Sequence, residues 1–143
     1  MRQNFEPKVW GPHAWFFLET IAMGYSTNPS YEEKKAAENF FKSLHLMIPC
    51  DKCRINYKNH LIKHPLTEKV LSSRDNLFMW IVDIHNSVDH NNTKSYDDTF
   101  QYYMKEYNVE VNENKTNISN SKFFFISIFF IIIFLIYQIY LNL

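Results

Sequence analysis

The sequence predicts an all-α protein: a four-helix bundle with a short fifth helix, followed by a C-terminal transmembrane helix. Apolar residues recur at helical spacing in five segments, and no segment shows the alternation of a strand. Glycine is scarce, at 2 of 143 residues, so tight hairpins and glycine-rich phosphate loops are not expected. Basic and acidic residues balance at 15 each, so we expect no nucleic-acid partner.

The first two helices follow from their boundary residues. We place the start of the first at Pro12, a favoured first helical position, and expect a loose arm before it. The segment 27–30, "TNPS", breaks this helix. The second begins at Ser30, where Glu33 completes a capping-box pattern, and Pro49 ends or kinks it. Their apolar stripes are Trp15, Leu18, Ala22 and Tyr25, then Ala37, Phe40, Phe41, Leu44 and Met47.

Three further helices complete the domain. The third is expected from about Cys50 to His64, where a proline closes it. The fourth begins near Ser72 or Ser73, and Ser95 caps the short fifth helix. Their apolar faces carry Leu77, Trp80, Ile81, Ile84 and Val88, then Phe100, Tyr103, Met104 and Tyr107.

The rest of the chain divides into a linker and an anchor. We assign residues 1–107 to the folded domain, and the polar, Asn-rich stretch 108–122 to a linker. Residues 123–141 contain no charge, and at 1.5 Å per residue they span roughly 28 Å, about the hydrocarbon thickness of a bilayer. A buried core helix is the alternative, but this stretch has no side that would face water.

The only two cysteines, Cys50 and Cys53, lie in a segment that also carries His60 and His64. A zinc site would need all four within about 2.0–2.3 Å of one point. On a single helix the first and last would lie about 21 Å apart, which disfavours zinc. Two buried core thiols are a second interpretation.

A redox-active dithiol is the third interpretation of these cysteines. At the start of a helix, Cys50 and Cys53 share one face and their sulfurs can join. The unsatisfied N–H groups of a helix N-terminus favour the thiolate, which is the attacking species. Lys52 and Arg54 would add to that field. In a thioredoxin-type enzyme a strand precedes the CxxC pair, and the sequence shows no such strand here.

Taken together, four motifs resemble the FAD-linked sulfhydryl oxidases of the Erv/ALR type, most of all the short forms encoded by large cytoplasmic DNA viruses. The resemblance covers roughly residues 5 to 107. It implies that 1–107 is a sulfhydryl oxidase domain holding FAD within its four-helix bundle. The motifs are "WGPHAWFFLET" (10–20), "PCDKCRINY" (49–57), "HP" (64–65) and "IHNSVDH" (84–90).

The resemblance also implies roles for individual residues. Cys53 would be the catalytic cysteine near the isoalloxazine, and Cys50 the outer cysteine that exchanges with substrate. No metal ligand is implied. The implied cofactor-binding residues are Gly11, Trp15, Glu19, Tyr57, His85, Asn86, Val88 and Lys94.

The chain departs from the family pattern at three positions. Glu19 replaces a histidine that contacts the cofactor, Asp89 replaces an asparagine, and Asn91 stands where a lysine is frequent. A carboxylate near the cofactor would pair with a ribose hydroxyl but repel the pyrophosphate.

We therefore expect a FAD-dependent thiol oxidase that makes disulfides in a thioredoxin-like dithiol protein and passes the electrons to molecular oxygen, giving hydrogen peroxide. With no second cysteine pair, the chain would receive electrons directly from that partner. The resemblance suggests a homodimer through the first two helices. The alternatives are a tail-anchored helical adaptor with a decayed cofactor site and a structural metal module.

The expected location is a host or virion membrane, with the catalytic domain facing the cytosol. The apolar segment leaves the ribosome last and no apolar leader precedes the domain, so insertion would be post-translational. Lys115 and Lys122 before the anchor agree with this orientation. We expect the glycosylation sequons at Asn91, Asn114 and Asn117 to remain unused.

Overall fold

The computed structural model describes residues 3–89 and 93–109, and every regular element in these two ranges is helical. The helices belong to one compact unit that ends at Tyr107. The expected linker beyond residue 109 and the expected transmembrane segment 123–141 both lie outside the described residues. Within the part of the chain that is described, no helix is both long enough and apolar enough to cross a bilayer.

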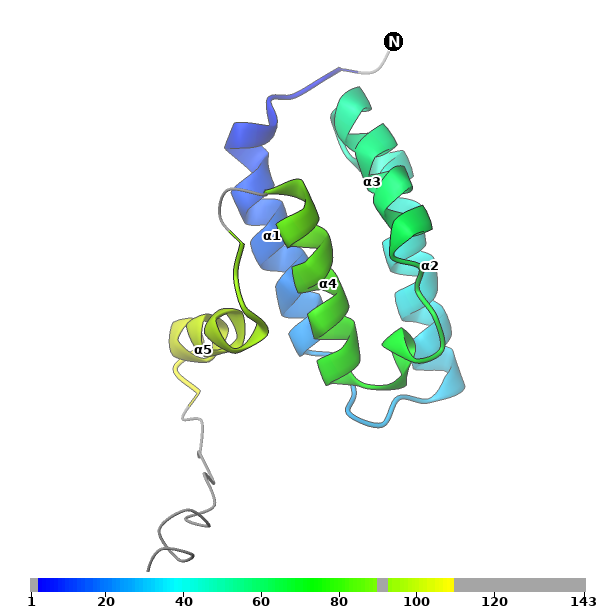
Figure 1. Cartoon of the computed structure of the whole chain (residues 1–143), viewed down its shortest axis with the longest axis vertical. Coiled ribbons are helices and arrows are strands. Elements are labelled where there is room, and N and C mark those ends of the chain that lie inside the picture. The colour runs from blue at the N-terminus through cyan, green and yellow to red at the C-terminus, as the bar shows by residue number, and fades with distance from the viewer. Residues whose placement is uncertain (1–2, 90–92, 110–143) are drawn as a thin grey trace, which may run out of the picture. The chain divides into compact units, whose positions relative to one another are not determined.

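Four long helices, a short 3-10 turn and a fifth helix follow one another along the chain (Figure 1). In Figure 1, α1 lies beside α4 and α2 beside α3, while α5 is seen almost end-on. The expected four-helix bundle with a short fifth helix is therefore confirmed. The elements are α1 (Pro7–Met23), α2 (Tyr31–Met47), α3 (Asp51–Lys63), η1 (Val70–Ser72), α4 (Arg74–Val88) and α5 (Tyr96–Glu106).

The expected start of the first helix was wrong. It begins at Pro7, which takes the first helical position that we assigned to Pro12. Pro12 instead lies inside α1, where its missing N–H leaves one carbonyl, that of Lys8, without a helical partner. Lys8 is exposed, so water can hydrogen-bond to that carbonyl. The helix therefore tolerates this proline near its first turn.

Residues 4 and 5, just before α1, are held against the start of α3 and are not loose as we expected. The Phe5 N–H donates to the carbonyl of Pro49 at 2.8 Å. The Asn4 side chain accepts from the Asp51 N–H at 2.8 Å and donates to the Asp51 carboxylate at 2.9 Å. Residues 4 and 5 are here called the N-terminal arm. The three hydrogen bonds attach this arm to Pro49 and Asp51, the two neighbours of Cys50 in the sequence.

The other helix starts lie where the capping residues indicated. Ser30 and Glu33 form the complete capping box, with distances of 3.2 and 2.7 Å. Ser73 caps α4 and Ser95 caps α5 through the same serine-to-backbone contact. Such a cap stabilises a helix by about 0.5–2 kcal/mol. The 3-10 turn η1, with Leu71 buried, was not expected from the sequence.

Helix α4, which carries His85, is the most buried helix of the described bundle. Six of its fifteen residues are buried, which is more than in any other described helix. The Trp80 indole N–H also donates to the carbonyl of His64, the residue that ends α3, at 2.9 Å. The buried residues of α4 are Leu77, Phe78, Trp80, Ile81, Val82 and Ile84.

Candidate active site

Cys50 and Cys53 are joined in a disulfide at the first turn of α3. Cys50 is the N-cap residue, and its sulfur accepts a hydrogen bond from the Cys53 N–H at 3.2 Å. This geometry supports the redox interpretation over two separate core thiols. Among the described residues, no three His, Cys, Asp or Glu side chains lie close enough together to hold a metal ion.

Of the two positive charges expected beside the cysteines, that of Arg54 is paired with a carboxylate. Arg54 forms an ion pair with Asp51, in the same first turn, and donates to the Ile48 carbonyl at 2.9 Å. Its positive charge is therefore largely compensated locally. The N–H groups of α3 favour a thiolate here, and one of them already points at the Cys50 sulfur.

A cavity of about 830 Å³ lies next to this disulfide. Its volume falls within the range of about 300–1,000 Å³ that is typical of small-molecule and cofactor sites. Side chains from α1, α2, α3, α4 and α5 line it, and Cys53 is among them. So are seven of the eight residues that we expected to bind a cofactor, namely Gly11, Trp15, Glu19, Tyr57, His85, Val88 and Lys94.

Asn86, the eighth residue, does not line the cavity but supports a residue that does. Its side-chain amide donates to the Lys94 carbonyl at 2.9 Å, and its side-chain oxygen accepts from the Lys94 N–H at 2.8 Å. These two bonds fix the backbone of Lys94 against the end of α4. Asn86 thus contributes by positioning Lys94.

The two cysteines also differ in their surroundings. Cys53 lines the cavity, whereas Cys50 does not and is only 9% exposed. The N-terminal arm is hydrogen-bonded to the residues on either side of Cys50. Cys53 is therefore the sulfur that a group bound in the cavity would meet, and Cys50 is the one beside the arm.

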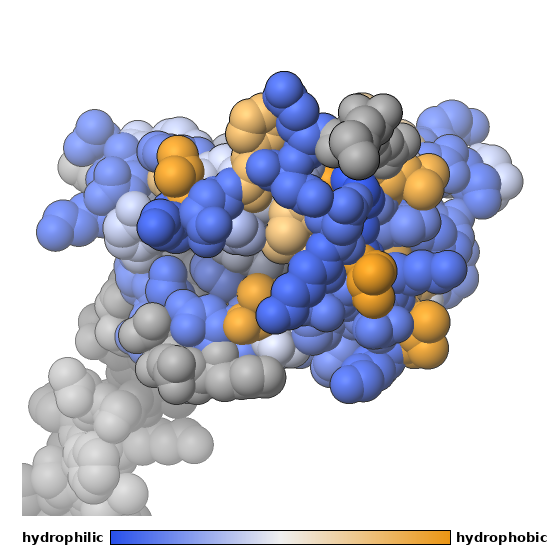
Figure 2. Space-filling model, turned by 90° about the horizontal axis from the view of Figure 1, so that it is seen from above, coloured by the Kyte–Doolittle hydropathy of each residue, from blue (hydrophilic) through white to orange (hydrophobic). Residues whose placement is uncertain are grey.

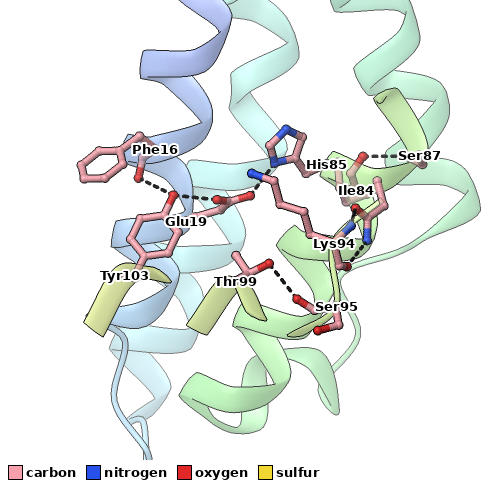
Figure 3. A network of polar contacts seen from close by, with 10 residues as sticks. Phe16, Glu19, Ile84, His85, Ser87, Lys94, Ser95, Thr99 and Tyr103 are labelled. Carbon is pink, nitrogen blue, oxygen red and sulfur yellow. Dashed lines mark hydrogen bonds and ion pairs between the residues drawn. The ribbon is translucent and has the colours of Figure 1, made fainter. Parts of the chain in front are cut away.

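Glu19 is buried, at 2% exposed, and both of its oxygens are engaged (Figure 3). One lies 2.6 Å from Nδ1 of His85, and the other accepts a hydrogen bond from the Tyr103 hydroxyl at 2.6 Å. Burial, the hydrogen bond and the charge of Glu19 raise the pKa of Tyr103 above its usual value, so the phenol stays protonated and donating. The Glu19 carboxylate is therefore already satisfied by protein groups.

Two aromatic side chains shape the wall further. The Trp15 ring stacks on the His85 ring, with centroids 4.2 Å apart and planes within 9° of parallel. Tyr57 is buried and also lines the cavity. Its hydroxyl is occupied, since it donates to the Phe41 carbonyl at 3.0 Å, so the ring is the part of Tyr57 that shapes the wall. Burial also raises the pKa of Tyr57, so its hydroxyl remains neutral.

Sequence reasoning missed several residues of this wall. Tyr103 was assigned only to the apolar side of the fifth helix, yet its hydroxyl reaches Glu19. Lys8 was placed in the loose arm, but it lies in α1 and lines the cavity with Lys94. A correct start of α1 at Pro7 would have revealed Lys8, whereas no signal in the sequence pairs Tyr103 with Glu19.

Comparisons with known proteins show the family and the relatives that this chain resembles. The model of the "Erv1 / Alr family" matches residues 12–108. A protein of Acanthamoeba polyphaga mimivirus, named "Probable FAD-linked sulfhydryl oxidase", is 50% identical over 84 residues, or 59% of each chain. A "FAD-linked sulfhydryl oxidase" of African swine fever virus is 31% identical over 80 residues, 56% of this chain and 65% of that protein. The match thus spans less than two thirds of the length of either viral protein.

A solved structure shows the same fold. The crystal structure of the yeast Erv1 core superposes with a TM-score of 0.63, covering 77% of this chain and 90% of that one. The sequence identity is 17%, so this likeness speaks for the fold alone.

Proposed function

The chain belongs to the Erv1 / Alr family, and on that premise we propose that it is a FAD-linked thiol oxidase. It would make disulfides in a partner dithiol protein and pass the electrons to molecular oxygen. One observation carries this proposal: the Cys50–Cys53 disulfide borders the cavity through Cys53, and that cavity also holds Trp15, His85 and Lys94.

The residues of the cavity fit a flavin dinucleotide. Aromatic rings offer surfaces for planar ring systems, and the ammonium groups of Lys8 and Lys94 suit a pyrophosphate. The carboxylate of Glu19 is bound to His85 and Tyr103, so it does not stand as a bare charge against that pyrophosphate. Bound FAD would supply the two-electron chemistry that links a dithiol to oxygen and yields hydrogen peroxide.

The two cysteines would carry out thiol–disulfide exchange with the partner. A partner thiolate attacks Sγ of Cys50, which forms a mixed disulfide and releases Cys53 as a thiolate. The second partner thiol, as its thiolate, then attacks the partner sulfur of that bond and releases Cys50. The partner loses two electrons as its disulfide forms, and Cys50 and Cys53 gain them. The Cys53 N–H, already directed at the Cys50 sulfur, would stabilise the thiolate there.

The direct test uses the full chain, purified in detergent and incubated with FAD. We expect visible flavin absorbance and oxygen consumption with dithiothreitol, with hydrogen peroxide as the product. Cys50→Ser should keep the flavin and lose oxygen consumption. A protein that stays colourless and consumes no oxygen would exclude the proposed oxidase and favour the helical adaptor.

We propose in addition that residues 123–141 anchor the protein in a host or virion membrane, with the domain in the cytosol. The uncharged composition of this segment and the preceding lysines support this. Protease added to sealed microsomes should remove the domain, and Asn114 and Asn117 should carry no glycan. Glycans on either residue would place the domain in the lumen instead.

A homodimer through α1 and α2 is the last part of the proposal. Apolar side chains on these helices are exposed, at 67% for Val9, 59% for Phe17 and 76% for Met47. Phe17 and Met47 also line the cavity, so a partner copy would help to close it. In the view of Figure 2, apolar groups lie apart from one another on a largely hydrophilic surface.

Sedimentation equilibrium tests the dimer. Wild type should contain two chains, and Phe17→Asp should contain one. Ile55→Asp changes a similarly exposed residue, at 63% against 59% for Phe17, but on α3, and should leave the dimer intact. A dimer that resists the Phe17 change and dissociates with the Ile55 change would place the interface on α3.

A further inference from the structure

We propose that Glu19 is a positioning residue that acts through His85. Its carboxylate holds the imidazole with a proton on Nδ1 and with Nε2 available for hydrogen bonding from the cavity. Resting on the proposed function, we assign Nε2 of His85 to a polar group of the FAD nucleotide.

The first step of the argument is the burial of Glu19. A carboxylate at 2% exposure is costly unless it is hydrogen-bonded or paired. Here each oxygen has its own partner at 2.6 Å: His85 from α4 and Tyr103 from α5. Three helices therefore meet at this one side chain, as Figure 3 shows.

The second step is the place of the proton between Glu19 and His85. Tyr103 stays protonated and donates to one oxygen of Glu19, which leaves the other oxygen to His85. The Lys94 side chain, drawn with the pair in Figure 3, lines the same cavity as Glu19 and His85. A carboxylate without a proton only accepts hydrogen bonds, so we assign the proton of the 2.6 Å contact to Nδ1.

The third step is the state of the other ring nitrogen. Among the described residues, Nε2 of His85 has no hydrogen-bond partner, and no buried side-chain nitrogen or oxygen there lacks one. Nε2 is therefore accessible, and His85 lines the cavity. Because Trp15 stacks on the face of the ring, the imidazole is held at Nδ1 and on its face while Nε2 remains available.

The test reads the ring directly, by nitrogen NMR of the full chain labelled with 15N-histidine. A His85→Gln variant identifies the His85 signals. We expect the neutral His85 ring of the wild type to carry its proton on Nδ1. A neutral ring protonated on Nε2 would mean that Glu19 holds the proton, and this result would overturn the proposal.

Two variants of Glu19 separate its hydrogen bond from its bulk and charge. Glu19→Gln retains an oxygen that accepts from Nδ1 and an amide that donates to Tyr103, so it should keep the wild-type signal. Glu19→Ala should shift the ring toward the Nε2-protonated form. If the Gln variant behaved like the Ala variant, positioning by this hydrogen bond would be excluded. Glu32→Gln, the same chemical change at an exposed site of α2, is the control.

FAD affinity supplies the second readout. Glu19→Ala should weaken binding about tenfold, the effect of losing one hydrogen bond of ordinary strength, and Glu19→Gln less than about threefold. Equal losses in both variants would overturn the assigned role. If circular dichroism shows Glu19→Ala to be unfolded, the NMR signals of the wild type and of Glu19→Gln decide whether the proposal holds. If the protein bound no flavin but gave the expected NMR result, the positioning role of Glu19 would stand. The proposed function would then be rejected.

Discussion

The cavity wall contains two polar clusters that are built in different ways. At the disulfide, Cys50 and Cys53 are three residues apart and share one helical turn. At the second cluster, Glu19 is 66 residues from His85 and 84 residues from Tyr103, and each residue belongs to a different helix. The first cluster depends on local backbone geometry, and the second depends on how α1, α4 and α5 pack. Changes to the two should therefore affect different properties of the protein.

The largest expected effect is at the disulfide, where the chemistry depends on two atoms. Cys50→Ser and Cys53→Ser should each reduce dithiol-dependent oxygen consumption to background, because each removes the only disulfide that the cysteines can form. Both variants should keep wild-type thermal stability within a few degrees, since the closed loop is short.

Spectra of these variants would sharpen the comparison between the cysteines. Because Cys53 lines the cavity, Cys50→Ser should show a long-wavelength absorption band from the Cys53 thiolate beside the bound flavin. Cys53→Ser should lack it. The opposite pattern would reverse the roles assigned to the two cysteines.

At the second cluster the expected effect is on stability. Tyr103→Phe leaves one oxygen of the buried Glu19 without its donor, which should lower the free energy of unfolding by about 1–3 kcal/mol. Urea denaturation measures this difference. Tyr102→Phe removes the same hydroxyl from a side chain that is 48% exposed and should change stability little. Equal effects from both variants would mean that the Glu19 contact contributes nothing specific.

A smaller effect is expected for the N-terminal arm. Asn4→Ala removes both side-chain hydrogen bonds to Asp51 and should weaken the closed arm by about 1 kcal/mol, roughly fivefold in its open fraction. We expect faster reduction of the Cys50–Cys53 disulfide by a small thiol, measured by stopped flow. Asn28→Ala, at an exposed residue between α1 and α2, is the control. An unchanged rate in Asn4→Ala would show that the arm does not limit access to Cys50.

The smallest effect is expected for the exposed ion pairs of Glu38 on α2, which lie outside both clusters. Hydrogen bonds from Lys35 and Lys42 lower the pKa of Glu38 from 4.5 to about 2. Since the folded-state pKa is the lower one, this contribution is present above pH 4.5 and is lost as the pH falls toward 2. Glu38→Gln should therefore differ slightly from wild type at pH 7 and match it near pH 2 in urea denaturation. A large difference at pH 7 would contradict the low value of exposed ion pairs.

Much of the helical pattern could be predicted because its determinants are local. Ser30, Ser73 and Ser95 each cap a helix through a contact that spans three residues. The start of α1 was mispredicted because two prolines, Pro7 and Pro12, both suit a first helical position, and the sequence alone does not rank them. The arm was missed for a different reason: its bonds join Asn4 to Asp51, which are 47 residues apart.

By itself, the sequence determined the five α-helices except for the start of α1, the redox-capable pair Cys50 and Cys53, and the resemblance that pointed to seven of the residues lining the cavity. Only the tertiary structure decided that Glu19 is buried between His85 and Tyr103, that Asn86 supports Lys94, and that Cys53 rather than Cys50 borders the cavity. The physical reason is the separation along the sequence between the residues that interact. Helix caps and a CxxC act over three or four residues, whereas the environment of a buried carboxylate depends on side chains that meet only after the helices have packed.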